Sequence, residues 1–340
     1  ECFRALTTPE AVTLVSSAGK VRASVPAGSK ATADMVQTDE AFWSVFSFRF
    51  LSGAGFTRAD CDAGLPRAVL SATIARQLFG TTDVVGHTVQ LNYIDYTVAG
   101  VVADVSMLAT AAYAQIWVPY TAADAESLSW QDDTMGPMHA VILAHSSADF
   151  DAIRKETELL RQKYNDGLRD VEIFYRGQPD TQLAYLYRRW YAEPDVPGVM
   201  LRYGIVIAIL LLVPAVNLSG MTLSRMRRRM AEIGVRKAFG ATGGELIRQV
   251  FFENFVLTLL AGVVGLALSY AATFLLNDFL FSNSTNAYLS GETALTPGML
   301  LSPWAFIAAF AFCLLMNVLS AGIPAWRASR MNITDAINQR

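Results

Sequence analysis

The sequence predicts an α+β domain followed by an all-α membrane domain of three transmembrane helices. Two observations lead to this prediction. The mean hydropathy of +0.31 is unevenly spread along the 340 residues. Charged residues occur throughout residues 1–195, whereas residues 196–340 hold long apolar runs interrupted by one strongly basic segment. We therefore expect a soluble domain over 1–195 and a membrane domain over 196–340.

The first domain alternates strand and helix signals. Ser71 is a candidate N-cap for a short helix over Ala72–Phe79, and Gly80 is its expected end. A hairpin is expected from Thr88–Asn92 and Tyr96–Asp104, with Tyr93 to Asp95 near its turn. The other expected strands are Ala11–Ser16, Ala33–Gln37, Ala68–Leu70, Ala114–Tyr120, Met138–His145 and Val171–Tyr175, and the other expected helices are Asp149–Tyr164 and Gln182–Tyr191.

Three apolar runs are long enough to cross a membrane. They cover Val199–Thr222, Phe255–Leu280 and Pro303–Ile323. A run of about 24 helical residues reaches roughly 36 Å, more than a hydrocarbon core of about 30 Å. In the second run, Ala261, Gly265 and Ser269 form a row of small residues that suits close helix packing, although chance explains such a row equally well.

The loops between these runs predict their orientation. The loop after the first run is rich in Arg and Lys, residues 282–302 contain neither, and three arginines follow the last run. Under the positive-inside rule, the basic loop and the C-terminus are cytoplasmic and residues 1–195 lie outside. An outer N-terminal domain needs an upstream signal or span, so we expect a fourth, N-terminal helix to be missing. Buried helices of a soluble protein would not explain this alternation of loop charge.

The residue types of a catalytic or metal site do not gather in this sequence. The three histidines and three cysteines show no metal-ligand spacing, and residues 240–244 do not form a phosphate-binding loop. Asp60 with Asp62 is an acidic pair without the partners of a catalytic set. We expect no enzyme activity, cofactor, metal or ATP site in this chain. Cys2 and Cys61 are either free thiols, which we favour, or a disulfide.

The basic loop also has local structure. Met226, Met230 and Ile233 share one helical face, and Gly240 should end that helix. Thr242 and Glu245 have the spacing of a capping box for a following helix. An interfacial basic helix held by anionic lipid would explain the loop without any protein partner.

The stretch from Glu232 to Ala241, E-I-G-V-R-K-A-F-G-A, resembles the E-I-G-x-R-x-A-x-G-A signature of MacB/FtsX-type permeases. The chain ending after Ala321 is similar to the family's ending, with Asn332 in place of the usual proline and Ile337 in place of leucine. Residues 68–80, 85–89 and 96–105 look like the MacB-type periplasmic core domain. The resemblance implies that the loop between the second and third of four membrane helices meets the ATPase. The implied coupling residues are Met230, Glu232, Ile233, Gly234, Val235, Arg236, Lys237, Ala238, Phe239, Gly240 and Ala241.

The resemblance implies a permease subunit of an ABC transporter in the bacterial inner membrane. ATP hydrolysis on a cytoplasmic ATPase, which binds ATP and Mg, would drive work by the outer domain. That work would be efflux of peptides or drugs, or lipoprotein extraction. The implied partners are this ATPase, a second permease copy or paralogue, membrane lipids, and optionally a periplasmic adaptor or outer-membrane channel, with no nucleic acid. The alternatives are an FtsX-like regulator of a cell-wall hydrolase and a membrane-anchored enzyme.

Overall fold

The computed structural model describes residues 3–26, 28–107, 109–122, 136, 138–188, 192–213, 216, 224, 235, 239–240, 242–275, 304 and 306–316. The chain divides into two compact units. The first holds Glu1–Glu193 with Asn277–Leu295, and the second holds Pro194–Leu276 with Thr296–Arg340. Pro214, Asn217 and most of the basic loop lie outside the described residues.

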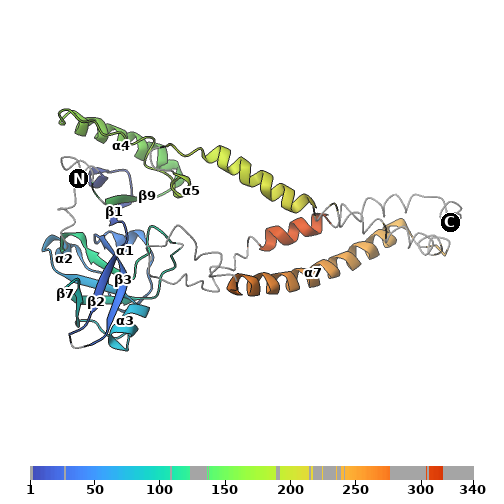
Figure 1. Cartoon of the computed structure of the whole chain (residues 1–340). Coiled ribbons are helices and arrows are strands. Elements are labelled where there is room, and N and C mark those ends of the chain that lie inside the picture. The colour runs from blue at the N-terminus through green and yellow to red at the C-terminus, as the bar shows by residue number, and fades with distance from the viewer. Residues whose placement is uncertain are drawn as a thin grey trace. The chain divides into compact units, whose positions relative to one another are not determined.

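The first unit is built on one nine-stranded sheet with helices around it, which confirms an α+β fold (Figure 1). Its strand order is β2-β6-β7-β5-β8-β3-β1-β9, β4 pairs with β7, and β2 also pairs with β3. The strands are β1 (Ala11–Ser16), β2 (Gly19–Ser24), β3 (Lys30–Thr38), β4 (Phe50–Gly53), β5 (Arg67–Ser71), β6 (Thr88–Leu91), β7 (Ile94–Val102), β8 (Ile116–Pro119) and β9 (Met138–Leu143). The α-helices of this unit are α1 (Phe42–Val45), α2 (Arg58–Asp62), α3 (Ala72–Phe79), α4 (Phe150–Asn165) and α5 (Gln182–Tyr187).

The β2–β3 pairing closes a ring through β2, β6, β7, β5, β8 and β3. Successive strand residues point to opposite faces, so one strand serves two cores. In β5, Leu70 belongs to the core that α3 covers, whereas Val69 belongs to a second core. Trp117 of β8 is fully buried in the second core and meets Phe48 at 5.4 Å between ring centroids. Aromatic residues dominate this second core, namely Phe42, Trp43, Phe46, Phe48, Phe50, Phe56 and Trp117.

Local signals placed several elements correctly. Strand β1 and helix α3 have the predicted bounds, Ser71 Oγ accepts from the N–H of Ile74, and Gly80 ends α3 with φ +78°. The hairpin turn was predicted one residue too late. It is formed by Asn92 and Tyr93, both with positive φ, because two such residues match the twist of the flanking strands.

The predicted strand at Val171–Tyr175 is wrong. Side chains of α4 occupy the backbone groups that a sheet would need: the Asn165 amide donates to the carbonyl of Ile173 at 3.0 Å and accepts from its N–H at 3.0 Å. The Arg161 guanidinium donates to the same carbonyl at 2.8 Å. The predicted helix at 182–191 begins at Gln182 as expected but ends at Tyr187, because the backbone of Arg188 is extended with ψ 124°. Residues 189–191 lie outside the described part.

In the part of the second unit that the structure describes, two helices are long and apolar enough to cross a membrane. One is Val196–Val213, and the other is the apolar part Phe255–Thr273 of helix α7 (Gly243–Leu275). Asp195 caps the first helix by accepting from the N–H of Gly198 at 3.0 Å. The described part of the third predicted span is the shorter apolar helix Phe306–Met316, so three spans stay a prediction.

Candidate functional site

The predicted coupling segment is described at three positions, Val235, Phe239 and Gly240. The N–H of Phe239 donates to the carbonyl of Val235 at 3.1 Å, a helical i to i−4 bond. Phe239 is 90% exposed, and Gly240 follows with φ +94°, in the left-handed region that favours glycine at a helix end. This φ agrees with the predicted stop at Gly240. The other predicted coupling residues lie outside the described ones: Met230, Glu232, Ile233, Gly234, Arg236, Lys237, Ala238 and Ala241.

The predicted capping box directly after this glycine is confirmed. The N–H of Thr242 donates to Glu245 Oε2 at 3.0 Å, and the N–H of Glu245 donates to Thr242 Oγ1 at 3.4 Å. The hydrogen bonds from the backbone and then the side chain of Thr242 lower the pKa of Glu245. A carboxylate in the first turn is also favoured by the positive end of the helix dipole. Two bonds therefore fix the start of α7.

Helix α7 has 33 residues, which is about 50 Å at about 1.5 Å per residue. It is longer than a hydrocarbon core of about 30 Å. Residues 243–254 precede its apolar window and carry Glu245, Arg248 and Glu253.

The predicted packing row on α7 is exposed at Ala261, Gly265 and Ser269, and a Cβ on Gly265 would meet nothing within 4 Å. The contact with the helix Phe306–Met316 uses a neighbouring row instead. A Cβ on Gly262 would lie 3.4 Å from the Phe310 ring, and Phe255 lies 6.5 Å from Phe310 between centroids. Packing through the predicted row stays a prediction.

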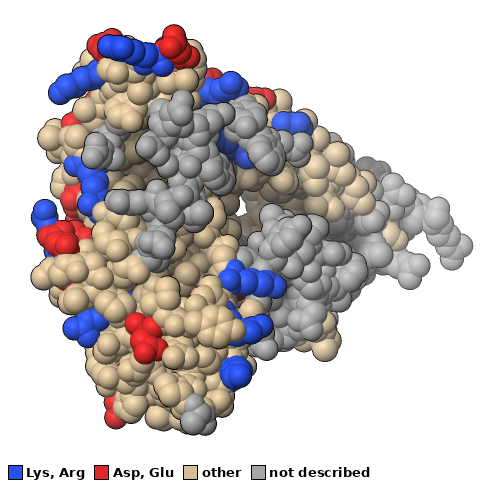
Figure 2. All heavy atoms as spheres, turned by 60° about the vertical axis from the view of Figure 1, so that its left-hand side comes forward, with Lys and Arg blue, Asp and Glu red and all other residues tan. Residues whose placement is uncertain are grey.

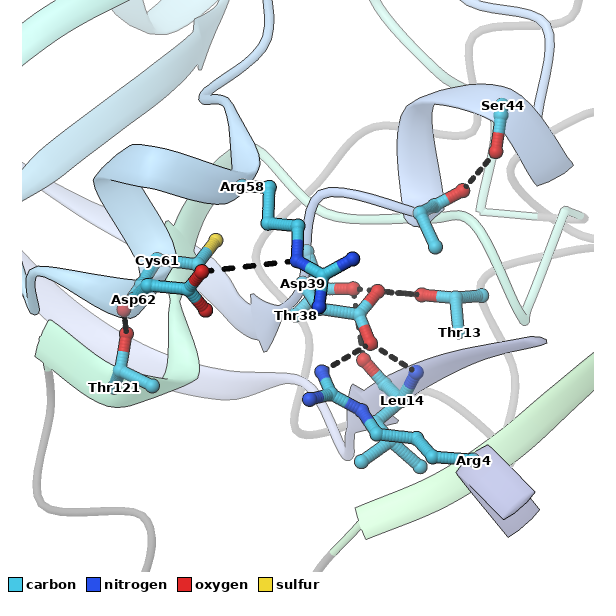
Figure 3. Close-up of polar contacts among 11 residues, drawn as sticks. Arg4, Thr13, Leu14, Thr38, Asp39, Ser44, Arg58, Cys61, Asp62 and Thr121 are labelled. Atoms are coloured by element: carbon cyan, nitrogen blue, oxygen red, sulfur yellow. Dashed lines mark hydrogen bonds and ion pairs between the residues drawn. The ribbon is translucent and has the colours of Figure 1, made fainter. Parts of the chain in front are cut away.

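In the first unit, the carboxylate of Asp39 anchors the first residues of the chain (Figure 3). Asp39 is 1% exposed and follows β3. It accepts from Thr13 Oγ1 at 2.5 Å, from the N–H of Leu14 at 3.1 Å and from Arg4 Nη2 at 3.0 Å. A buried carboxylate with three donors is well satisfied. Its ion pair holds the 3₁₀ turn Phe3–Ala5 to the junction of β1 and β3.

A second carboxylate, Glu156 of α4, binds the next residues. It accepts from the N–H and hydroxyl of Thr7, both at 2.7 Å, and from the N–H of Thr8 at 3.0 Å. Desolvation would raise the pKa of Glu156, but the hydrogen bonds from Thr8 and Thr7 outweigh it and lower the pKa to about 2. Phe3 also stacks on Tyr175 with ring centroids 5.4 Å apart.

A buried ion pair fixes the segment at the end of the first unit. Arg188 follows α5 and donates through Nη2 to Asp180 Oδ1 at 2.8 Å, with a second bond from Nε to Oδ2. Both side chains are 8% exposed. Arg188 also donates to the carbonyl of Arg176 at 3.0 Å and to the carbonyl of Ala192 at 3.2 Å. One guanidinium thus ties together the chain on both sides of α5.

Sequence reasoning missed these anchors. The partners of Asp39 lie 25 to 35 residues away, and Thr7 lies 149 residues from Glu156. An acidic residue directly after an alternating strand was the available signal at Asp39. Among the described residues, no three His, Cys, Asp or Glu side chains form a group that could hold a metal ion. Cys61 is a free, buried thiol whose pKa is raised by burial to about 12, and Cys2 lies outside the described residues.

Charged side chains of both signs lie among uncharged ones on the face seen in Figure 2. A surface of mixed sign differs from the single-sign field that steers highly charged ligands.

Two family models match the chain in succession. The MacB-like periplasmic core domain matches residues 3–160, and the FtsX-like permease C-terminal domain matches residues 204–333. The pyoverdine export ATP-binding/permease protein PvdT of Pseudomonas aeruginosa is 25% identical over 87% of this chain and 41% of its own length. The chain thus spans less than half the length of this relative.

The uncharacterized ABC transporter permease YknZ of Bacillus subtilis is 25% identical over 88% of this chain and 68% of its own length. The crystal structure of the periplasmic region of MacB from Actinobacillus actinomycetemcomitans is similar at 20% identity, with a TM-score of 0.38, over 47% of this chain and 70% of that one. The two models together account for both halves of the sequence in the expected order, and the chain belongs to the MacB/FtsX-type family of ABC transporter permeases.

Proposed function

We propose that this chain is a permease subunit through which ATP hydrolysis on a cytoplasmic ATPase drives work by the outer domain. The observation that carries this proposal is the short connection between the coupling segment and α7. The helical turn of the signature stops at Gly240, the signature ends at Ala241, and the Thr242–Glu245 capping box begins the 33-residue α7. A displacement of the segment would therefore pass into the membrane without a flexible linker.

The anchors of the outer unit support the same mechanism. In the four-helix arrangement of the family, the chain enters the outer domain through its first residues and leaves it before Val196. The entry residues are held by Asp39 and Glu156, and the exit is held by Arg188 and Asp180. Phe3 and Tyr175 bring the two connections into contact. A movement applied at either connection would be passed to the whole unit.

The topology that we assign has residues 1–195 outside and the permease domain over 196–340, with spans near 199–222, 255–280 and 303–323. The C-terminus and the coupling segment are cytoplasmic. We assign ATP hydrolysis to a partner subunit or to another part of the same polypeptide, and a second permease copy completes the complex. The PvdT relative is a pyoverdine export protein by name. For this chain we propose efflux of peptides or drugs, or lipoprotein extraction.

The test uses the full permease co-purified with its ATPase in lipid vesicles. Glu232 and Arg236 are four residues apart, and the variant Glu232→Arg with Arg236→Glu reverses both charges. Charges at the rim of an interface mainly set specificity and association rate. The double variant should retain the basal ATPase rate and lose the response of that rate to the permease, with a weakened complex in co-purification.

The chain offers a matched control. Arg58 and Asp62 of α2 form an exposed i,i+4 ion pair at 3.7 Å in the outer unit. Reversing this pair as Arg58→Asp with Asp62→Arg should leave the coupled ATPase rate unchanged, since exposed pairs contribute little. If coupling survives the reversal of Glu232 and Arg236, these residues are not the ATPase contacts.

A further inference from the structure

Helix α5 presents apolar side chains that the outer unit does not cover. Leu183, Tyr185 and Leu186 are 44%, 48% and 60% exposed, and Ala184 is the one buried residue of this helix. Leu183 and Leu186 are three residues apart and share one side of the helix, so this exposed apolar side is a candidate interaction surface.

The ion pair beside this patch fixes its place in the chain. Arg188 binds Asp180 before α5 and the carbonyl of Ala192 after it. The next anchored residue is Asp195, which caps the apolar helix Val196–Val213. Ala192 and Asp195 are three residues apart, which limits the connecting chain to about 10 Å at about 3.3–3.6 Å per residue. Only three residues of chain therefore separate the carbonyl that Arg188 holds from the cap of the apolar helix.

The composition of this stretch points to one occupant. Residues 183–191 read Leu-Ala-Tyr-Leu-Tyr-Arg-Arg-Trp-Tyr and combine aromatic, aliphatic and basic side chains without an acidic one. Tyrosine and tryptophan gather at membrane–water interfaces, where basic side chains reach the headgroups. A membrane helix that starts at Val196 would also place a lipid surface near this stretch of the chain.

We infer that α5 lies on the outer surface of the membrane, with Leu183 and Leu186 in the boundary between headgroups and acyl chains. Interfacial helices bury their apolar face about 5–10 Å deep. The inference rests on the topology of the proposed function, because it requires the helix Val196–Val213 to span the membrane. In this arrangement α5, which Arg188 holds in place, is a fixed contact between the domain of residues 1–195 and the lipid.

The test places an environment-sensitive fluorophore on Leu186→Cys in the full chain. The background carries Cys2→Ser and Cys313→Ser and keeps the buried Cys61. The protein is reconstituted in phosphatidylcholine vesicles that contain a minor fraction of lipid with a doxyl group near the acyl carbonyl. The label should show blue-shifted emission, quenching by the doxyl lipid and loss of most quenching by aqueous iodide. A label on Leu183→Cys repeats the measurement at a second position of the same helix.

Two further positions serve as controls. Leu159 of α4 is 65% exposed and should stay accessible to iodide, whereas Ile207 is 54% exposed on the membrane helix and should be quenched by doxyl lipid. Iodide quenching at Leu186 equal to that at Leu159 overturns the inference. Shielding of Leu186 from both quenchers also overturns it, because a second copy or another protein then covers α5. If Ile207 is not quenched by lipid, the topology of the proposed function fails as well.

Discussion

Glu156 and Thr7 are joined by two hydrogen bonds of 2.7 Å, one from the N–H of Thr7 and one from its hydroxyl, across 149 residues of sequence. Glu156 adds a third bond, from the N–H of Thr8 at 3.0 Å. A single carboxylate thus attaches α4 to the segment that precedes β1. Because all three groups donate to the Glu156 carboxylate, this contact is strongest when Glu156 is ionised.

The Glu156 contact predicts a pH dependence. The pKa of this carboxyl is lowered from 4.5 to about 2 in the folded protein. A lowered pKa stabilises the fold above the unfolded pKa, and this stabilisation is lost as the pH falls from about 4.5 towards 2. Glu156→Gln should lose part of the contact at neutral pH, costing roughly 1 kcal/mol for a partly exposed charged acceptor. Amide hydrogen exchange at Thr7 and Thr8 in the full chain measures the loss.

The control for this prediction is Glu158→Gln on the same helix. Glu158 pairs with Arg161 of its own helix at 2.6 Å, so exchange at Thr7 and Thr8 should match the wild type. The difference in exchange rate between the wild type and Glu156→Gln should also shrink as the pH falls from 5 to 3, because protonation of Glu156 weakens the contact in the wild type. Equal exchange in both variants would contradict the assigned role of Glu156.

The elements of this fold that could be predicted are those whose ends are set by residues close together in the sequence. Helix α3 follows from Ser71 and Gly80 at its two ends, and the start of α7 follows from Thr242 and Glu245, three residues apart. Strand β2 and the short strand β4 gave no such local signal. The Asp39 and Glu156 anchors depend on partners brought together by the sheet, which a single sequence does not reveal.

The Asp180–Arg188 pair predicts a large cost for losing one partner and a small cost for losing both. Arg188→Met leaves the Asp180 carboxylate buried without its cation, and breaking such a pair costs about 3–5 kcal/mol. Chymotrypsin should then cut the full chain faster near Tyr185 and Tyr187. Replacing both partners, as Asp180→Asn with Arg188→Met, should restore most of the resistance.

An exposed pair provides the comparison. Arg58 and Asp62 lie 3.7 Å apart with side chains 81% and 72% exposed, and Arg58→Met should change the cutting rate little. If Arg188→Met is cut no faster than Arg58→Met, the buried pair does not hold the segment around α5.

The aromatic core predicts that Gly55 does not tolerate a side chain. A Cβ at this position would lie 2.5 Å from Cγ and Cδ1 of Trp43, which in turn packs against Phe56 at 5.3 Å. Gly55→Ala must displace the indole, and overpacking of this kind costs about 1–3 kcal/mol. Thermal unfolding of the full chain followed by tryptophan fluorescence should shift to lower temperature. Gly19→Ala is the matched control, since a Cβ there meets nothing within 4 Å, and an equal shift in both variants would contradict the packing at Trp43.

The cap of α7 predicts a link between a local hydrogen bond and coupling. Thr242→Ala removes the Oγ1 that accepts from the N–H of Glu245, which costs about 1 kcal/mol at a helix N-cap. Amide exchange in the first turn of α7 should accelerate, and the response of the ATPase rate to the permease should fall while the basal rate is kept. Thr242→Ser retains the oxygen and should retain both properties. Faster exchange with unchanged coupling would show that the rigid joint after Gly240 does not transmit the movement.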